Sequence, residues 1–273
     1  MGTVSTLSIV FMGISCILGI VIPIVLFLYF YKVKHTDIKP FFIGCLVMLL
    51  FAFVIEGGLN FLVSTSSVWD KISGNMWYYG IYGGLMAGIF EETGRFLAFK
   101  TVLKKNQENP NNALMYGAGH GGFEAFVILF LGMIGNLITA LMINAGAYES
   151  MLATAGMDEA TLEATKEGLA ALIQTEPSYF LAAGVERFFA VVIQISLSVM
   201  VWFAAKNAKD WYLYPIAILC HAVIDFIAVV VTQRGYGIWR IEGVVVLLTC
   251  CIYSVAKLVW YQRVTKCSSN IEN

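Results

Sequence analysis

Seven long apolar stretches limit this chain to one class of fold. A helix that crosses the hydrocarbon core of a bilayer needs about 20 predominantly apolar residues, and each stretch is that long. They cover residues 7–31, 41–63, 77–99, 113–144, 179–205, 211–232 and 239–261. Charged residues make up 13% of the chain, whereas soluble domains have about 25%. The sequence therefore predicts an all-α polytopic membrane protein, a bundle of about seven transmembrane helices.

Basic residues predict how this bundle is oriented. They concentrate in the first, third and fifth connections and in the C-terminal tail, as Lys32, Lys34, Lys39, Lys104, Lys105, Lys206, Lys209 and Arg263. Cytoplasmic loops are enriched in Lys and Arg, so we expect the N-terminus outside and the C-terminus in the cytoplasm. Residues 1–273 are expected to form a single integral membrane domain. Residues 145–178 form its external loop, in which residues 158–174 have the pattern of a short amphipathic helix.

Three polar motifs interrupt the apolar stretches. They are Glu91-Glu92-Thr-Gly-Arg95, His120-Gly-Gly-Phe-Glu124 and His221-Ala-Val-Ile-Asp225. An ionisable side chain in the bilayer centre costs roughly 2.5–3.5 kcal/mol, so such residues usually mark a working site. The i,i+4 spacing places each histidine and its carboxylate on one face of a helix. This combination of carboxylates and imidazoles is typical of sites that activate water.

The polar side chains are expected to meet in one interior cavity. With 1.5 Å of rise per residue, Glu91, His120 and His221 lie about 10–15 Å from the cytoplasmic ends of their helices. The second to sixth spans hold six carboxylates, but the permanent cations of these five spans are Arg95 and Arg187. These carboxylates cannot all be ionised and unpaired in a low dielectric. Some are therefore expected to be protonated, bonded to a histidine or neutralised by a metal ion.

Each motif also has a structural explanation. Arg95 can hold Glu91 or Glu92 at i,i+4 or i,i+3 spacing, while the other glutamate turns about 100° away. A buried ion pair would explain one glutamate and leave the second unexplained. Each histidine–carboxylate pair can be a polar bridge between helices, and Glu186 with Arg187 can be an interhelical clamp.

Glycines near two of the motifs are expected to let helices approach closely. Gly83, Gly84 and Gly88 precede the paired glutamates, and Gly119 and Gly121 flank the histidine of the second motif. Small residues allow helix backbones to come close together in lipid. The glycines in the unusually long fourth stretch can also permit a break or a tilt there.

At these motifs the sequence resembles the glutamic-type intramembrane proteases. This superfamily contains the CAAX proteases and bacteriocin-processing enzymes, the PrsW proteases and, more distantly, the Aph-1 subunit of gamma-secretase. The order Glu-Glu-x-x-Arg, Gly-His-Gly-Gly-Phe-Glu-Ala, Glu-Arg and His-x-x-x-Asp is most similar to the YhfC-type branch. The resemblance covers about residues 77–232 and implies that they form the catalytic core of an intramembrane endopeptidase. It also implies a location in a bacterial plasma membrane.

The resemblance implies roles for the acidic residues. Glu91 matches the glutamate that takes a proton from water as the water attacks the peptide carbonyl. Glu92 and Arg95 are implied to support it. Glu186 and Arg187 match the Glu-Arg step of the family order and are implied to support the site as well.

The resemblance also implies roles for the histidines. His120 and His221 would polarise the carbonyl or stabilise the oxyanion, and Glu124 and Asp225 would orient them. Tyr116 matches the aromatic residue that the family places four residues before a histidine. Alternatively, Glu124 takes the position of the PrsW glutamate, and His120 then takes the aromatic position.

Three other functions stay open alongside the glutamic peptidase, which needs no cofactor. In a zinc-dependent protease, His120, Glu124, His221 and Asp225 would be ligands, although the chain lacks a His-Glu-x-x-His helix. A proton-coupled transporter would use the same groups as a relay, and a non-catalytic membrane scaffold would keep only the bundle. The formal net charge of −1 gives no reason to expect nucleic acid as a partner. The expected partners are the lipid bilayer and a membrane-associated peptide or protein substrate, and the oligomeric state is unknown.

Overall fold

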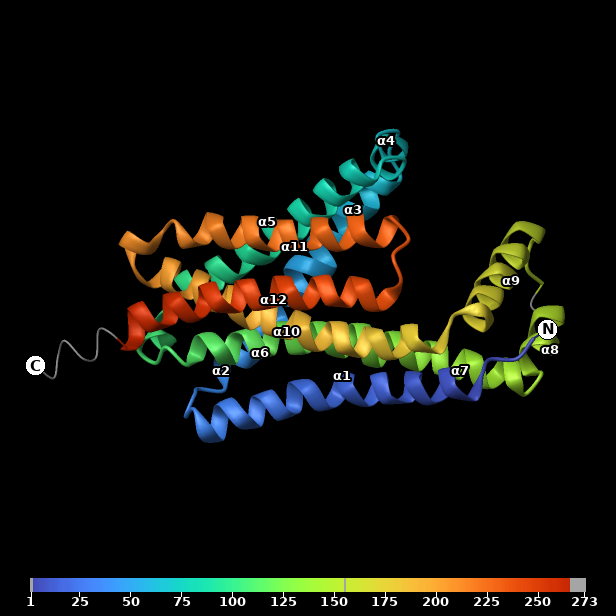
Figure 1. The fold of residues 1–273 in the computed structure, drawn as a ribbon, viewed down its shortest axis with the longest axis horizontal. Coiled ribbons are helices and arrows are strands. Elements are labelled where there is room, and N and C mark those ends of the chain that lie inside the picture. Colours follow the sequence, from blue (N-terminus) through green and yellow to red (C-terminus); the bar gives the residue numbers. More distant parts are fainter. Residues whose placement is uncertain (1, 155, 266–273) are drawn as a thin grey trace, which may run out of the picture. The chain divides into compact units, whose positions relative to one another are not determined.

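A computed structural model describes residues 2–154 and 156–265 of the chain. Its regular elements within these residues are all helical, as Figure 1 shows. They are α1 (Thr6–Val33), α2 (Lys39–Val47), η1 (Met48–Glu56), α3 (Gly57–Ser64), α4 (Trp69–Ser73), α5 (Met76–Lys100), η2 (Lys104–Glu108), α6 (Asn112–Ala125), η3 (Phe126–Leu131), α7 (Gly132–Asn144), α8 (Ala147–Thr154), α9 (Glu159–Gln174), α10 (Pro177–Lys206), η4 (Ala208–Asp210), α11 (Leu213–Gln233), α12 (Ile238–Trp260) and η5 (Tyr261–Thr265). The predicted all-α fold is confirmed.

Six helical runs in the described residues are long and apolar enough to cross a membrane. They are Thr6–Val33, Lys39–Ser64, Asn112–Asn144, Pro177–Lys206, Ala208–Gln233 and Ile238–Thr265. The remaining expected span is α5, a helix of 25 residues that is more polar because it carries Glu91, Glu92 and Arg95. The chain is thus an integral membrane protein of many helices, and the total of seven spans stays a prediction.

The chain forms two compact parts, and the two longest helices, α1 and α10, contribute to both. The smaller part comprises Met1–Val21 and Ala125–Arg187, and the larger part comprises Ile22–Glu124 and Phe188–Asn273. The expectation of a single integral membrane domain stays a prediction. All three polar motifs lie in the larger part, so this part determines how the candidate site is built.

The smaller part contains the helix expected between residues 158 and 174. Its counterpart α9 begins at Glu159, directly after Asp158. The Asp158 carboxylate accepts the backbone N–H of Thr161 at 2.9 Å, and this bond lowers the pKa of Asp158. An N-cap of this kind satisfies an N–H group that would otherwise have no partner in the helix. The predicted helix is confirmed, and the position of this loop outside the membrane stays a prediction.

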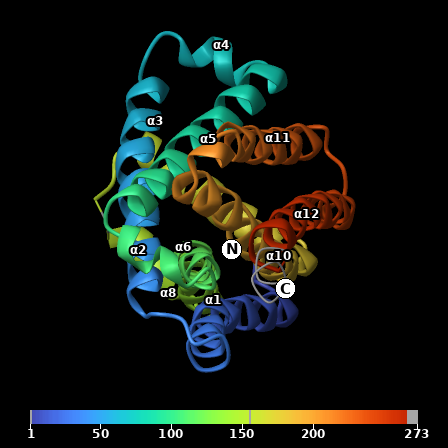
Figure 2. The same cartoon turned by 90° about the vertical axis from the view of Figure 1, so that its left-hand side faces the viewer.

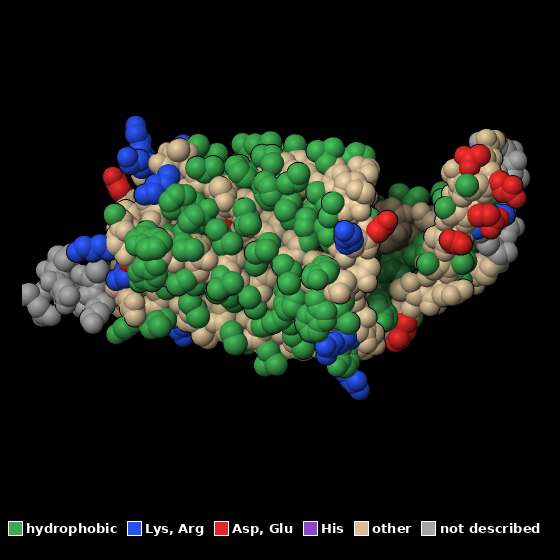
Figure 3. Space-filling view, turned by 90° about the horizontal axis from the view of Figure 1, so that it is seen from above, with side chains coloured by type: hydrophobic (Ala, Val, Ile, Leu, Met, Phe, Trp, Pro, Cys, Tyr) green, Lys and Arg blue, Asp and Glu red, His purple; other side chains and the backbone are tan. Residues whose placement is uncertain are grey.

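The connections that carry basic residues lie together at one end of the larger part. Lys39 donates to the carbonyl oxygen of Val102 at 2.9 Å, and Lys206 donates to that of Gln107 at 2.6 Å. Figure 3 shows Lys and Arg side chains at the left-hand end, and others where the hydrophobic surface ends on the other side. Cytoplasmic loops are enriched in Lys and Arg. The orientation with the end that carries Lys39 and Lys206 in the cytoplasm stays a prediction.

Close contact between α5 and α11 depends on two glycines of α5. A Cβ atom on Gly84 would lie 2.2 Å from the carbonyl oxygen of Ala222, and one on Gly88 would lie 2.7 Å from that of Ile218. The expectation that Gly83 also serves packing is wrong, because a Cβ there meets nothing within 4 Å. Gly83 precedes Gly84 by one residue, so a Cβ atom on Gly83 would point about 100° away from one on Gly84, which faces α11.

Glycines also hold α6 close to its neighbours. A Cβ on Gly119 would lie 2.0 Å from the carbonyl oxygen of Phe41 in α2, and one on Gly117 would lie 2.5 Å from the Cα of Ile195 in α10. Figure 2, a view along the helices, shows α6 next to both. The long fourth stretch does not break at its glycines. Instead, its helical run contains the π-helix η3 after Ala125, a form often found at functional sites.

We predict that Gly84→Ala destabilises the protein whereas Gly83→Ala does not. The added methyl group at residue 84 overlaps the α11 backbone, and overpacking of this kind costs typically about 1–3 kcal/mol. At residue 83 the methyl group has space, and replacing a helical glycine stabilises by up to about 1 kcal/mol. Thermal unfolding of the two purified variants in one detergent measures the difference. Equal unfolding temperatures would contradict the assigned α5–α11 contact.

Candidate functional site

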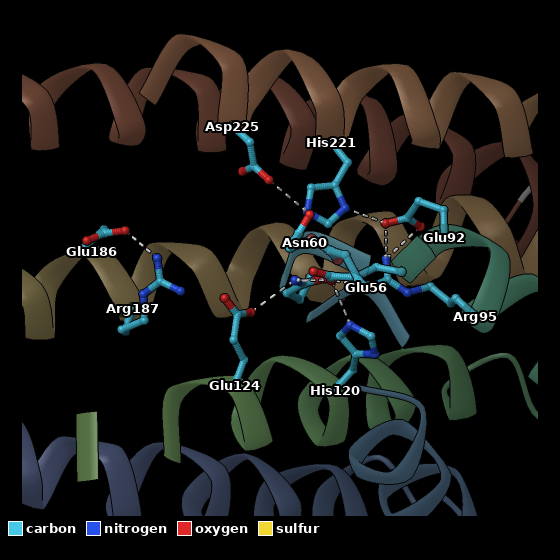
Figure 4. A network of polar contacts seen from close by, with 12 residues as sticks. Glu56, Asn60, Glu92, Arg95, His120, Glu124, Glu186, Arg187, His221 and Asp225 are labelled. Carbon is cyan, nitrogen blue, oxygen red and sulfur yellow. Dashed lines mark hydrogen bonds and ion pairs between the residues drawn. The ribbon is translucent and has the colours of Figure 1, made fainter. Parts of the chain in front are cut away.

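The three motifs meet among four helices of the larger part. The site consists of Glu91, Glu92 and Arg95 of α5, His120 and Glu124 of α6, Gln194 of α10, and His221 and Asp225 of α11. Figure 4 labels Glu92, Arg95, His120, Glu124, His221 and Asp225 among them. The side chains of Glu92, Arg95 and His120 have no exposed surface. Polar side chains this deeply buried find most of their hydrogen-bond partners within the cluster itself.

The two adjacent glutamates have different partners. Nη1 of Arg95 donates to both carboxylate oxygens of Glu92, at 2.9 and 2.8 Å. Glu91 turns away from this pair, and its Oε2 is hydrogen-bonded to Nε2 of His120 at 2.9 Å. The prediction that Arg95 holds one glutamate while the other faces a different group is confirmed. One carboxylate is neutralised inside α5, and the other is directed toward α6.

Glu92 also orients His221. Nδ1 of His221 lies 2.8 Å from Oε1 of Glu92, within hydrogen-bond distance. Nε2 of the same ring lies 3.7 Å from Oδ2 of Asp225, which is close enough for an ion pair but too far for a hydrogen bond. The predicted pairing of His221 with Asp225 is thus found at ion-pair distance, and the role of Asp225 in orienting the ring stays a prediction. The carboxylate of Glu92 contacts the other ring nitrogen, a partner on α5 that the spacing within α11 did not predict.

Gln194 connects Glu91 with Glu124. It was not among the predicted site residues. Its Nε2 donates to Glu91 at 2.9 Å and to Glu124 at 3.0 Å. Its Oε1 accepts from Nη2 of Arg95 at 2.5 Å. A side-chain amide can serve both a cation and carboxylates because it is donor and acceptor at once. The available signal was a lone amide inside the apolar stretch from 188 to 197.

The expected pairing between His120 and Glu124 does not occur. Nε2 of His120 is bonded to Glu91, and Nδ1 has no hydrogen-bond partner among the described residues. Glu124 instead accepts a hydrogen bond from Gln194. The i,i+4 spacing places both side chains on one face of α6, but α5 and α10 each offer a closer partner. His120 is thus oriented from α5.

Tyr116 supports His120 by stacking. The two rings lie 5.8 Å apart with an angle of 29° between their planes. Tyr116 in turn packs edge to face against Phe99, with ring centroids 4.5 Å apart, and Phe99 packs in the same way against Trp202. This aromatic column leaves the His120 ring little freedom to turn. Tyr116 thus contacts the histidine four residues after it, and its supporting role in the site stays a prediction.

Glu186 and Arg187 belong to the smaller part of the chain. They form an ion pair with each other there. They are neighbours in α10, so this ion pair lies within one helix. The interhelical clamp and the supporting role of the two residues in the site stay predictions.

The donor atoms of the site are of types that bind zinc, since zinc binds imidazole nitrogen and carboxylate oxygen. Their arrangement does not match a metal site, because within the described ranges no three His, Cys, Asp or Glu side chains are grouped as metal ligands. His120 and His221 are hydrogen-bonded to two different glutamates, and Arg95 already neutralises one of these. The arrangement as folded does not fit a metal ion.

We predict that Glu92→Gln lowers the free energy of unfolding by about 3–5 kcal/mol, because it leaves the Arg95 guanidinium buried without a carboxylate. The double variant Glu92→Gln/Arg95→Met should recover part of this loss, since it removes both charges. Unfolding in mixed micelles of increasing denaturant measures all three proteins.

The matched control for this prediction is Glu163→Gln in α9. It removes the partner of Lys166 at the same i,i+3 spacing, but there the two side chains are 61% and 46% exposed. An exposed pair contributes about 0–1 kcal/mol. If the Glu92 and Glu163 substitutions cost equally little, the buried pair does not hold the site together.

Two comparisons with known proteins match most of the chain. The model of the family described as "YhfC intramembrane metalloprotease" matches residues 18–246. The "Uncharacterized membrane protein YhfC" of Bacillus subtilis (strain 168) is 36% identical over 234 residues, which cover 85% of this chain and 88% of that protein. No solved structure matches the chain. The range matched by the family model includes every residue of the site.

Proposed function

The chain belongs to the YhfC intramembrane metalloprotease family, and we propose that it is an intramembrane endopeptidase whose water is activated by a glutamate. It hydrolyses peptide bonds of membrane-associated peptides or proteins. The observation that carries this proposal is the division between the adjacent glutamates. Arg95 neutralises Glu92, whereas Glu91 is hydrogen-bonded to an imidazole and to an amide and is left to act as a base.

The reaction begins when water attacks the carbonyl carbon of the peptide bond. The Glu91 carboxylate takes a proton from this water, while His120 holds the carboxylate in place through Nε2. General-base assistance of this kind contributes about 10²–10⁴-fold to the rate. The C–N bond then breaks, the leaving amine takes the proton from Glu91, and the second product keeps the new carboxyl group.

Charge that develops on the carbonyl oxygen needs a donor nearby. His221 is suited to this role when it is protonated, because its ring lies between the carboxylates of Glu92 and Asp225. Nδ1–H is held by Glu92, and Nε2–H is then available to the oxyanion. Donors that are oriented before the reaction stabilise such charge more effectively than water does.

Gln194 and Tyr116 position the reacting groups. Gln194 restrains the Glu91 carboxylate and links it to Arg95, and Tyr116 restrains the His120 ring. Glu124 is bonded to Gln194 and so belongs to the same network. None of these roles requires a nucleophilic serine or cysteine, so the peptide is hydrolysed without a covalent intermediate.

The family is described as a metalloprotease family, so zinc is the second candidate for activating the water. We favour the glutamate because the histidines and carboxylates are paired with one another and not grouped around one point. A non-catalytic scaffold and a proton-coupled transporter are the alternatives from other classes. We place the protein in a bacterial plasma membrane, in line with its relative from Bacillus subtilis.

Mapping of new protein N-termini in host membranes tests the proposed function. Membranes containing the wild type or Glu163→Gln are expected to share N-termini that are lost with Glu91→Gln, because the base is missing. The expected decrease is at least about 100-fold. Glu163 is a suitable control because its side chain is exposed on α9. If Glu91→Gln is folded and all three samples give the same termini, the protein is a scaffold or a transporter.

Metal analysis of the purified protein separates the two peptidase mechanisms. We predict well below one zinc ion per chain and cleavage that survives a chelator, because zinc needs at least three protein ligands around one point. Glu163→Gln serves as the control for non-specific metal. One zinc per chain in the wild type and Glu163→Gln, lost on His120→Ala and on His221→Ala, would instead establish the metalloprotease.

A further inference from the structure

A cavity lies on a different face of α10 from Gln194. It has a volume of about 470 Å³ and is bounded by α1, α6, α10 and α12 of the larger part. From α10 it is lined by Val192, Ile195, Ser196 and Val199. These residues follow i, i+3, i+4, i+7 spacing and so form one stripe of the helix. The cavity is separate from the polar site, because that stripe faces away from the amide of Gln194.

The cavity has an apolar and a basic end. Counting 1.5 Å per residue from Lys206, Val192 lies about 21 Å along α10 and Val199 about 10 Å. At the near end the lining includes Lys34, just after α1, and Lys257, in the last turn of α12. The cavity thus runs from apolar side chains of α10 to two ammonium groups. A lipid has the matching arrangement of an apolar chain and a charged headgroup.

Within residues 2–154 and 156–265, neither lysine has an anionic partner. Among the described residues that line the cavity, none is acidic, and no hydrogen bond or ion pair joins either ammonium group to the described chain. Trp260, Tyr29 and Tyr253 line the same cavity. Trp and Tyr are enriched where a membrane protein meets the headgroups. A negatively charged group bound next to Lys34 and Lys257 would neutralise both cations.

We propose that this cavity binds one anionic glycerophospholipid of the surrounding membrane. An acyl chain lies along the α10 stripe, and the phosphate lies between Lys34 and Lys257. The charge of the lining selects for an anionic lipid, because a zwitterionic headgroup would bring a third cation next to the two lysines. The site is independent of peptide hydrolysis, since it shares no side chain with the proposed catalytic network.

Native mass spectrometry of the full-length protein tests this site with two lipids of identical chains, phosphatidylglycerol and phosphatidylcholine. The wild type is expected to take up one phosphatidylglycerol at low concentration and phosphatidylcholine much more weakly. The double variant Lys34→Gln/Lys257→Gln should weaken phosphatidylglycerol binding by about 10- to 30-fold, the effect of removing two basic residues at a membrane surface. The matched control Lys104→Gln/Lys105→Gln removes two exposed charges from η2 and should leave binding unchanged.

A third variant tests the apolar end. Ser196→Phe places a ring in the cavity and should weaken binding of phosphatidylglycerol even though both lysines remain. Equal binding of the two lipids, or an equal loss in both lysine double variants, would show a general lipid coat and overturn the proposal. Loss in Ser196→Phe with full binding in Lys34→Gln/Lys257→Gln would indicate an uncharged occupant and overturn it too. If Ser196→Phe does not fold, the exposed lysine variants still decide the outcome.

Discussion

The ion pair between Glu92 and Arg95 is the interaction on which the rest of the site depends. Both side chains have no exposed surface, so their charges can persist only as partners. The pair sets which side of α5 faces inward, and this directs Glu91 toward α6. Arg95 then reaches Gln194 in α10, and Glu92 reaches His221 in α11. One intrahelical contact therefore ties three further side chains from three helices into a single network.

The all-helical fold and the meeting of the three polar motifs could be predicted because both depend on local sequence. Apolar length predicts spanning helices, and i,i+3 or i,i+4 spacing predicts that Arg95 meets one of the two glutamates. The partners of His120 and His221 could not be predicted in this way. Spacing shows which residues share a face of one helix, whereas hydrogen bonds between helices depend on how far each helix is rotated and shifted. Gln194 was missed for another reason, since an amide carries no charge and costs less in lipid than a carboxylate does.

Backbone contacts at glycines determine how precisely the network can form. Gly84 and Gly88 bring α11 against α5, and Gly117 and Gly119 bring α6 against α10 and α2. At these distances a helix cannot slide without overlapping atoms of its neighbour. The side chains of glutamate, glutamine and histidine can therefore reach across from one helix to the next. The glycines thus allow the contacts between helices that bring the polar motifs together, although only the motifs supply reactive groups.

The amide of Gln194 gives the network a direction. Its oxygen faces the guanidinium of Arg95 and its nitrogen faces two carboxylates. Reversing the amide would place the donor nitrogen against the guanidinium and the acceptor oxygen against the carboxylates. A shift of α10 by one residue would turn the side chain by about 100° and remove it from all three groups. Insertions or deletions between residue 194 and the end of α10 at Lys206 are thus compatible with the site only as whole helical turns. The length of this segment is constrained in addition to the identity of its residues, nearly all of which are buried.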